Sequence, residues 1–94
     1  MAHLLIRHKV KDYAAWKATF DAFVETRRAG GEKSWQIWHP HDDPNNLVVL
    51  FEWDNLENAR AFMTNPDLKR TMEEAGVVEP PEAHFLEEYD RGTV

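Results

Sequence analysis

His8 is the side chain of this sequence best suited to acid–base chemistry. It lies in a run in which Leu4, Ile6, His8 and Val10 alternate with other residues, the period-two pattern of a strand. Because alternate side chains of a strand share one face, the imidazole belongs to the same face as apolar core residues. A histidine can take a proton from a phenol or a 1,3-dicarbonyl compound near neutral pH. We therefore expect His8 to be a catalytic base that opens onto a pocket, and the alternative is a histidine hydrogen-bonded at the rim of the core.

Aromatic side chains are numerous in this short chain, with four Trp, five Phe and two Tyr. Flat rings stack on flat aromatic molecules, so a group of them beside His8 favours an aromatic or polyketide-like substrate. Ordinary core packing is the alternative for each of them. The expected substrate-binding residues are Trp16, Trp35, Phe51, Trp53, Phe62 and Met72.

A second group of potential ligands follows the middle of the chain, where His39, His41, Asp42 and Asp43 lie close together. Imidazoles two residues apart can converge on one divalent metal ion. The same segment holds two prolines and two asparagines, which is typical of an exposed turn. We interpret it as a loop and expect no metal site.

The charge is uneven along the chain. Its net value is −6, but residues 1–40 carry seven Lys and Arg against four Asp and Glu, whereas residues 41–94 carry four against thirteen. The only basic stripe is Arg7, Lys9 and Lys11 on one short strand, which argues against nucleic-acid binding.

No cysteine is available for a disulfide or a thiolate nucleophile, and no apolar run approaches the length of a membrane span. The first seven residues are too short and too soon interrupted by charge for a signal peptide. We expect a cytoplasmic protein without a membrane partner.

The elements that would position these residues can be read from periodicity. A first strand over residues 4–11 precedes a helix that Asp12 caps and that runs to about Arg28, before Gly30 and Gly31 stop it. Residues 34–39 and 47–53 form a strand hairpin.

The second half begins with a capping box formed by Asp54 and Glu57, which predicts a helix. Pro66 restarts a further helix that ends near Gly76, and a last strand covers residues 84–89.

This order is β-α-β-β-α-(α)-β, the ferredoxin-like α+β plan of one domain over residues 1–94, with a four-stranded antiparallel sheet and helices on one face. The first strand lies between the third and the fourth. Arg7 and Glu52 are then expected to form an ion pair, and the basic first strand is expected beside Glu87 and Glu88.

The hairpin is apolar on both faces, so its second face needs a cover. We expect a homodimer whose contact includes Trp38, Val48 and Leu50.

The sequence resembles, over nearly its whole length, the dimeric α+β barrel proteins of the antibiotic biosynthesis monooxygenase type, often called "cyclase"-like. The resemblance rests on residues 7–16, 49–54, 59–62 and 75–77, which read RHKVKDYAAW, VLFEWD, ARAF and AGV. It implies two sheets packed face to face as a barrel, with a pocket between sheet and helices in each subunit. Relatives include cofactor-free oxygenases, polyketide cyclases, haem-degrading enzymes and isomerases, so the resemblance does not select one reaction.

The haem-degrading relatives have a tryptophan at the end of the third strand, then a tryptophan and a ligand histidine on the following helices. The matching positions here are Trp53, Phe62 and Met72. Because the iron-binding imidazole is absent, we expect no haem and no other cofactor. Three functions stay open: a cofactor-free oxygenase or cyclase acting on an aromatic molecule, a binding protein without turnover, and a structural homodimer.

Overall fold

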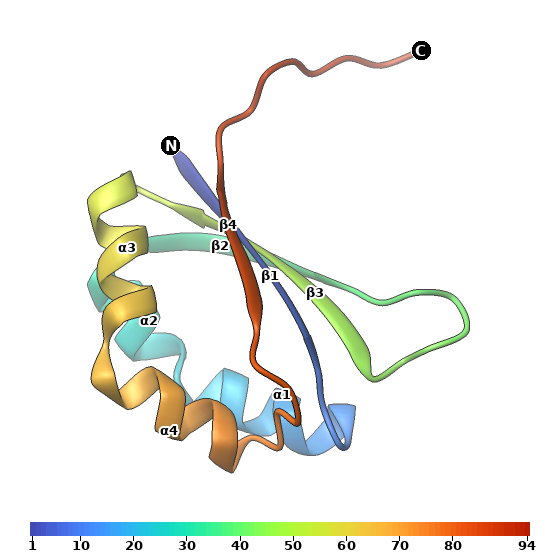
Figure 1. The fold of residues 1–94 in the computed structure, drawn as a ribbon. Coiled ribbons are helices and arrows are strands. Elements are labelled where there is room, and N and C mark those ends of the chain that lie inside the picture. Colours follow the sequence, from blue (N-terminus) through green and yellow to red (C-terminus); the bar gives the residue numbers. More distant parts are fainter.

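The computed structural model describes residues 1–94 as a four-stranded antiparallel sheet with helices on one face (Figure 1). The elements are β1 (Ala2–Lys9), α1 (Tyr13–Ala22), α2 (Val24–Gly30), β2 (Glu32–Trp38), β3 (Asn46–Trp53), α3 (Leu56–Thr64), α4 (Pro66–Glu74) and β4 (Glu82–Leu86). The strand order is β2-β3-β1-β4, which places β1 between β3 and β4. The predicted ferredoxin-like α+β class is confirmed. No helix is both long enough and apolar enough to span a membrane.

The core lies between the sheet and the helices. Along β1 the buried residues alternate, and Leu4, Ile6 and His8 face the helices. In the antiparallel register Leu4 lies opposite Phe51 and Ile6 opposite Val49, so both central strands bury the same face. The strand parity expected for His8 is therefore correct.

The predicted single helix after β1 is two helices. Asp12 does cap α1, because its carboxylate accepts a hydrogen bond from the backbone nitrogen of Ala15 at 2.9 Å. The helix then breaks at Phe23, and the Phe20 carbonyl oxygen accepts a hydrogen bond from Arg27 Nη1 at 2.6 Å. The Arg27 side chain thus donates to a carbonyl oxygen at the end of α1, and this hydrogen bond offsets the free-energy cost of breaking the helix.

Gly31 ends α2 in the left-handed conformation, with φ of +113°. Its carbonyl accepts a hydrogen bond from the Asp54 backbone nitrogen at 3.0 Å, so the end of α2 is tied to the end of β3. This contact holds Asp54 in a turn rather than at a helix cap.

The N-cap of α3 is accordingly Asn55, one residue later than predicted. The Asn55 side chain accepts from the Asn58 backbone nitrogen at 2.8 Å, whereas Asp54 accepts from the Asn55 backbone nitrogen and from the Asn58 side chain. The expected capping box of Asp54 with Glu57 is wrong.

The expected ion pair between Arg7 and Glu52 is also wrong. In the antiparallel pairing of β1 with β3, Arg7 lies opposite Val48, and Glu52 lies opposite His3. The His3 Nε2 atom is 3.7 Å from a Glu52 carboxylate oxygen. The two strands run in opposite directions, so residues near the end of β1 meet the start of β3.

The last strand begins two residues earlier than predicted and ends at Leu86, which leaves Glu87 and Glu88 beyond it. Arg7 faces Glu82 in the register of β1 with β4. The acidic residues beside the basic end of β1 are therefore not the pair that we expected.

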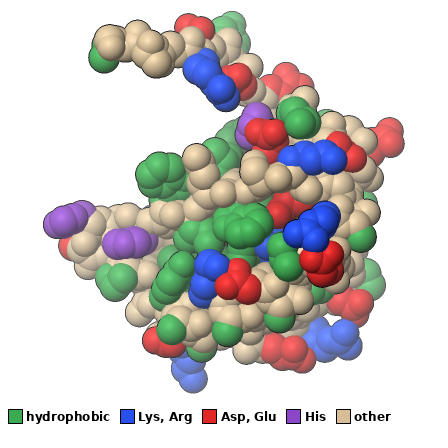
Figure 2. All heavy atoms as spheres, turned by 180° about the vertical axis from the view of Figure 1, so that it is seen from behind, with side chains coloured by type: hydrophobic (Ala, Val, Ile, Leu, Met, Phe, Trp, Pro, Cys, Tyr) green, Lys and Arg blue, Asp and Glu red, His purple; other side chains and the backbone are tan.

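The face of the sheet away from the helices is partly apolar. Trp38 lies opposite Val48, and Gln36 lies opposite Leu50. The Trp38 side chain is conspicuous, because 57% of this residue is exposed. Seen from behind, hydrophobic side chains gather at the centre of the molecule beside the β2–β3 hairpin (Figure 2).

Candidate functional site

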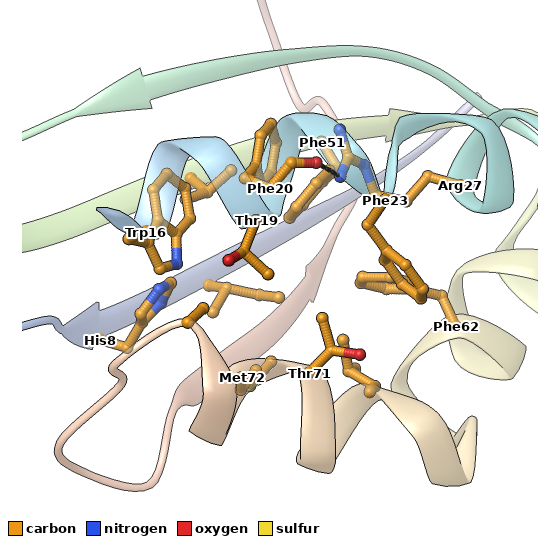
Figure 3. Close-up of a pocket in the computed structure, with 14 residues that line it drawn as sticks. His8, Trp16, Thr19, Phe20, Phe23, Arg27, Phe51, Phe62, Thr71 and Met72 are labelled. Atoms are coloured by element: carbon orange, nitrogen blue, oxygen red, sulfur yellow. Dashed lines mark hydrogen bonds between the residues drawn. The ribbon is translucent and has the colours of Figure 1, made fainter. Parts of the chain in front are cut away.

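A cavity of about 50 Å³ lies between the sheet and the helices (Figure 3). Ten of its fourteen lining residues are hydrophobic. The polar exceptions are His8, Thr19, Arg27 and Thr71. An apolar pocket with a few polar groups is the common form of a small-molecule site.

His8 lies at one end of this cavity, and only 6% of it is exposed. Neither ring nitrogen has a hydrogen-bond partner. The ring centre lies 5.6 Å from that of Trp16, at an angle of 50°. Desolvation by burial lowers the pKa of His8 to about 4, so the imidazole is neutral at pH 7 and keeps a free lone pair. Buried polar atoms in native proteins nearly always have a hydrogen-bond partner. A bound ligand or a water molecule can supply the partner that the His8 ring lacks.

The walls of the pocket are aromatic. Trp16 and Phe20 of α1 stack at 4.9 Å with an angle of 25°. Phe20 lies 6.0 Å from Phe51 of β3, which lies 5.7 Å from Phe62 of α3. Met72 from α4 completes the lining. The structure therefore brings together five of the predicted site residues: His8, Trp16, Phe51, Phe62 and Met72.

Trp53 does not line the cavity. It is 1% exposed and lies behind the wall, 5.1 Å from Phe62 and 6.5 Å from Phe51. Gly30 also lies close to its ring, within van der Waals distance. Trp53 is therefore a core residue that lies outside the lining of this cavity, and its contact with substrate stays a prediction.

Trp35 does not line the cavity either. It lies on the edge strand β2 and is 38% exposed, and its ring meets Phe20 edge-on at 5.5 Å. As an edge residue it covers the outside of the Phe20 ring. Trp35 thus lies outside the lining of this cavity, and its role in substrate binding stays a prediction.

Arg27 is the charged lining residue that the sequence analysis did not predict, and Thr19 and Thr71 were not predicted either. Arg27 is 2% exposed and stacks on Phe20, with the guanidinium carbon 3.7 Å from the ring centre. Its Nε donates to Glu32 Oε1 at 2.8 Å and its Nη1 to the Phe20 carbonyl, but Nη2 has no partner. The available signal was spacing, since Phe20, Phe23 and Arg27 follow one another at three- and four-residue steps.

Burial also acts on the ion pair itself. Desolvation lowers the pKa of Arg27 and raises the pKa of Glu32, and the attraction between the two groups opposes both changes. A guanidinium stays protonated in proteins, so the pair remains an Arg27 cation facing the Glu32 carboxylate at neutral pH.

The histidine- and aspartate-rich loop between β2 and β3 is exposed. His39, which we expected at the end of the strand over residues 34–39, lies beyond the end of β2, and its Nδ1 is 2.6 Å from the Pro40 carbonyl oxygen. No three histidine or carboxylate side chains converge as a metal site requires.

No protein-family model and no curated protein matches the sequence. Solved structures do share the fold. The cofactor-independent oxygenase SnoaB from Streptomyces nogalater has a TM-score of 0.76 at 14% identity, with 96% of this chain and 94% of that chain covered. The ActVA-Orf6 monooxygenase of Streptomyces coelicolor, in complex with nanaomycin D, has a TM-score of 0.64 at 20% identity, with 99% and 89% covered.

A further structure, of an antibiotic biosynthesis monooxygenase, has a TM-score of 0.70 at 14% identity, with 96% of this chain and 100% of that chain covered. At these identities the likeness shows the fold alone. The chain therefore has the fold of the antibiotic biosynthesis monooxygenase structures along nearly its whole length, as the sequence resemblance implied.

Proposed function

We propose that this chain binds a flat phenolic or polyketide-like aromatic molecule and acts on it as a cofactor-free oxygenase or cyclase, with His8 as the base. The observation that carries this proposal is the state of His8. Its two ring nitrogens are buried without a partner beside a stack of aromatic rings. A histidine with only a packing role is expected to find a hydrogen-bond partner.

The reaction follows from the neutral imidazole. The O–H or C–H bond of the bound phenol or 1,3-dicarbonyl breaks, its proton moves to a His8 ring nitrogen, and the electron pair stays on the substrate as a phenolate or enolate. The new anion beside His8 stabilises the imidazolium and raises the low pKa of the empty site. In the oxygenase case the carbanion carbon bonds to molecular oxygen, the His8 proton moves to the resulting hydroperoxide anion, and loss of water leaves a ketone on the substrate. In the cyclase case the carbanion carbon bonds to a carbonyl carbon of the same molecule, and the His8 proton moves to the alkoxide oxygen.

The size of the cavity adds a requirement. Its 50 Å³ is about one third of the roughly 150 Å³ that holds benzene in an engineered protein cavity. An aromatic ligand must therefore displace a lining side chain. Met72 is the best candidate, because its unbranched side chain adapts most easily. We expect binding to be coupled to movement of Met72 on α4.

The three structures named above are of an oxygenase and two monooxygenases, and the oxygenase is cofactor-independent, which supports the oxygenase form of the proposal. The proposal includes a homodimer formed through the bare face of the sheet and a cytoplasmic location. Binding without turnover and a structural homodimer are the alternatives, and the small volume of the cavity favours the structural homodimer.

Titration with 6-ethyl-2-naphthol and with anthrone, followed by tryptophan fluorescence and by oxygen uptake, tests this proposal. We expect His8→Ala to keep the fold and weaken binding. His8→Gln is the matched control, because it keeps a hydrogen-bonding side chain but removes the base. It should bind the ligand and lose oxygen uptake.

Binding that occurs without oxygen uptake or ring closure in the wild type would support the binding protein instead. If neither compound binds, the pocket has no such role and the structural homodimer stands.

A further inference from the structure

We propose that Arg27 is a second polar anchor, which binds a ketone oxygen of the ligand at the end of the pocket opposite His8. This inference rests on the proposed function, because it concerns the aromatic ligand of the same pocket. It specifies the ligand further, as an elongated flat aromatic with a hydroxyl group at one end and a ketone at the other.

The first observation is the unused donor of Arg27. Arg27 lines the cavity, and only 2% of it is exposed. Nη2 is its one side-chain nitrogen without an acceptor. The other two nitrogens are fixed by Glu32 and by the Phe20 carbonyl. A buried charged donor without an acceptor is costly, so an acceptor oxygen supplied by a ligand is strongly favoured.

The second observation is the position of the two anchors. Figure 3 shows His8 beside Trp16 at one side of the pocket and the Arg27 guanidinium on the far side of Phe20 from them. Trp16 and Phe20 are nearly parallel, and the Arg27 guanidinium continues the stack over Phe20. Because these groups cover one another's faces, the wall between the anchors consists of apolar ring edges, and ring edges pack well against the face of a fused ring system.

The charge of the site favours a ketone over a carboxylate. Glu32 already neutralises Arg27 through a bond of 2.8 Å between buried groups. A ligand carboxylate would place a second anion against the same guanidinium in a region of low dielectric, which is unfavourable. A carbonyl oxygen accepts the Nη2 hydrogen bond without that repulsion.

Two probes of nearly equal shape test the inference. Both 6-acetyl-2-naphthol and 6-ethyl-2-naphthol carry the hydroxyl group for His8, but only the first carries a ketone. We expect the wild type to bind the ketone about tenfold or more tightly, the scale of a hydrogen bond to a charged donor. The double variant Arg27→Met/Glu32→Gln removes the donor without leaving a lone buried charge, and it should bind the two probes equally. Glu32→Gln alone keeps Arg27 and should keep the preference.

A direct measurement on the wild type covers the case in which the double variant does not fold. The infrared stretching band of the ketone should move to lower frequency on binding, because a guanidinium hydrogen bond weakens the C=O bond. Equal affinities of the wild type for both probes, or an unshifted band, would overturn the role of Arg27 while the aromatic pocket stands. If neither probe binds, the proposed function fails and this inference fails with it.

Discussion

Arg27 contacts Phe20 twice, through the ring, whose centre lies 3.7 Å from the guanidinium carbon, and through the backbone carbonyl oxygen, 2.6 Å from Nη1. One side chain therefore both allows the helix to break after α1 and holds the aromatic ring that forms the pocket wall. The position of Phe20 in the site depends on the same contact that shapes the fold.

Arg27→Lys should accordingly destabilise the protein by about 1–3 kcal/mol. A lysine keeps the charge but has no planar guanidinium for stacking and cannot satisfy Glu32 and the Phe20 carbonyl in the same fork geometry. Arg28→Lys is the control at the next position, where the side chain is 66% exposed, and it should change stability by less than about 0.5 kcal/mol. Urea unfolding of the two variants measures the difference, and equal stabilities would contradict a structural role for the Arg27 fork.

The pH dependence of stability should report the burial of His8. Its pKa falls from 6.5 to about 4 on folding, so the unfolded chain binds more protons between these values and unfolding becomes easier as the pH falls. The free energy of unfolding that depends on a neutral His8 is fully present above pH 6.5 and is lost as the pH falls toward 4. The full loss is about 3 kcal/mol.

His8→Gln cannot titrate and is the control for this measurement. Between pH 6.5 and 4 its free energy of unfolding should fall less steeply than that of the wild type. Burial raises the pKa of Glu32, so protonation of Glu32 increases the free energy of unfolding as the pH falls. Both proteins contain Glu32, so its effect cancels in the comparison. Parallel curves in chemical denaturation would show that His8 is not buried as a neutral ring.

The burial of His8 could be predicted from the sequence because it depends only on strand parity, which Leu4 and Ile6 establish on the same strand. The position of Phe51 in the aromatic wall could be predicted from strand parity too. The positions of Trp16 and Phe62 could be predicted from helical spacing. These are local periodicities, and they agree with the packing of the sheet on the helices.

The parts that were not predicted depend on contacts between distant segments. Arg27 is an ordinary charged residue in the sequence, and its burial requires Glu32 beyond Gly31 as well as a break in the helix before it. Trp53 shares its strand face with Phe51, and only the placement of α3 decides which of the two reaches the cavity.

This distinction between Phe62 and Trp53 can be measured. Both Phe62→Ala and Trp53→Ala remove aromatic groups packed against one another and should destabilise the protein, by about 3–5 kcal/mol for the fully buried Trp53. Phe62→Ala should also weaken binding of 6-ethyl-2-naphthol, because Phe62 lines the cavity and Trp53 does not. Calorimetric titration at a temperature at which both variants are folded tests this. A larger loss of affinity in Trp53→Ala than in Phe62→Ala would move the ligand to the far side of the wall.

The oligomeric state is the last prediction, and it concerns the face of the sheet that no helix covers. Trp38 is 57% exposed there, and Val48 and Leu50 lie on the same face in β3. An apolar sheet face of this kind is stable when a second copy covers it, so we expect a homodimer that buries more than about 1,000 Å². Leu50→Glu should weaken the dimer by about tenfold or more, because it would bury a charge at the contact.

Val78→Glu is the matched control, since Val78 is 54% exposed but lies between α4 and β4, outside the sheet. It should leave the dimer unchanged. Sedimentation equilibrium at micromolar concentration measures all three proteins. A folded wild-type monomer under these conditions, or equal weakening by both glutamates, would contradict the assignment of this face as the dimer contact.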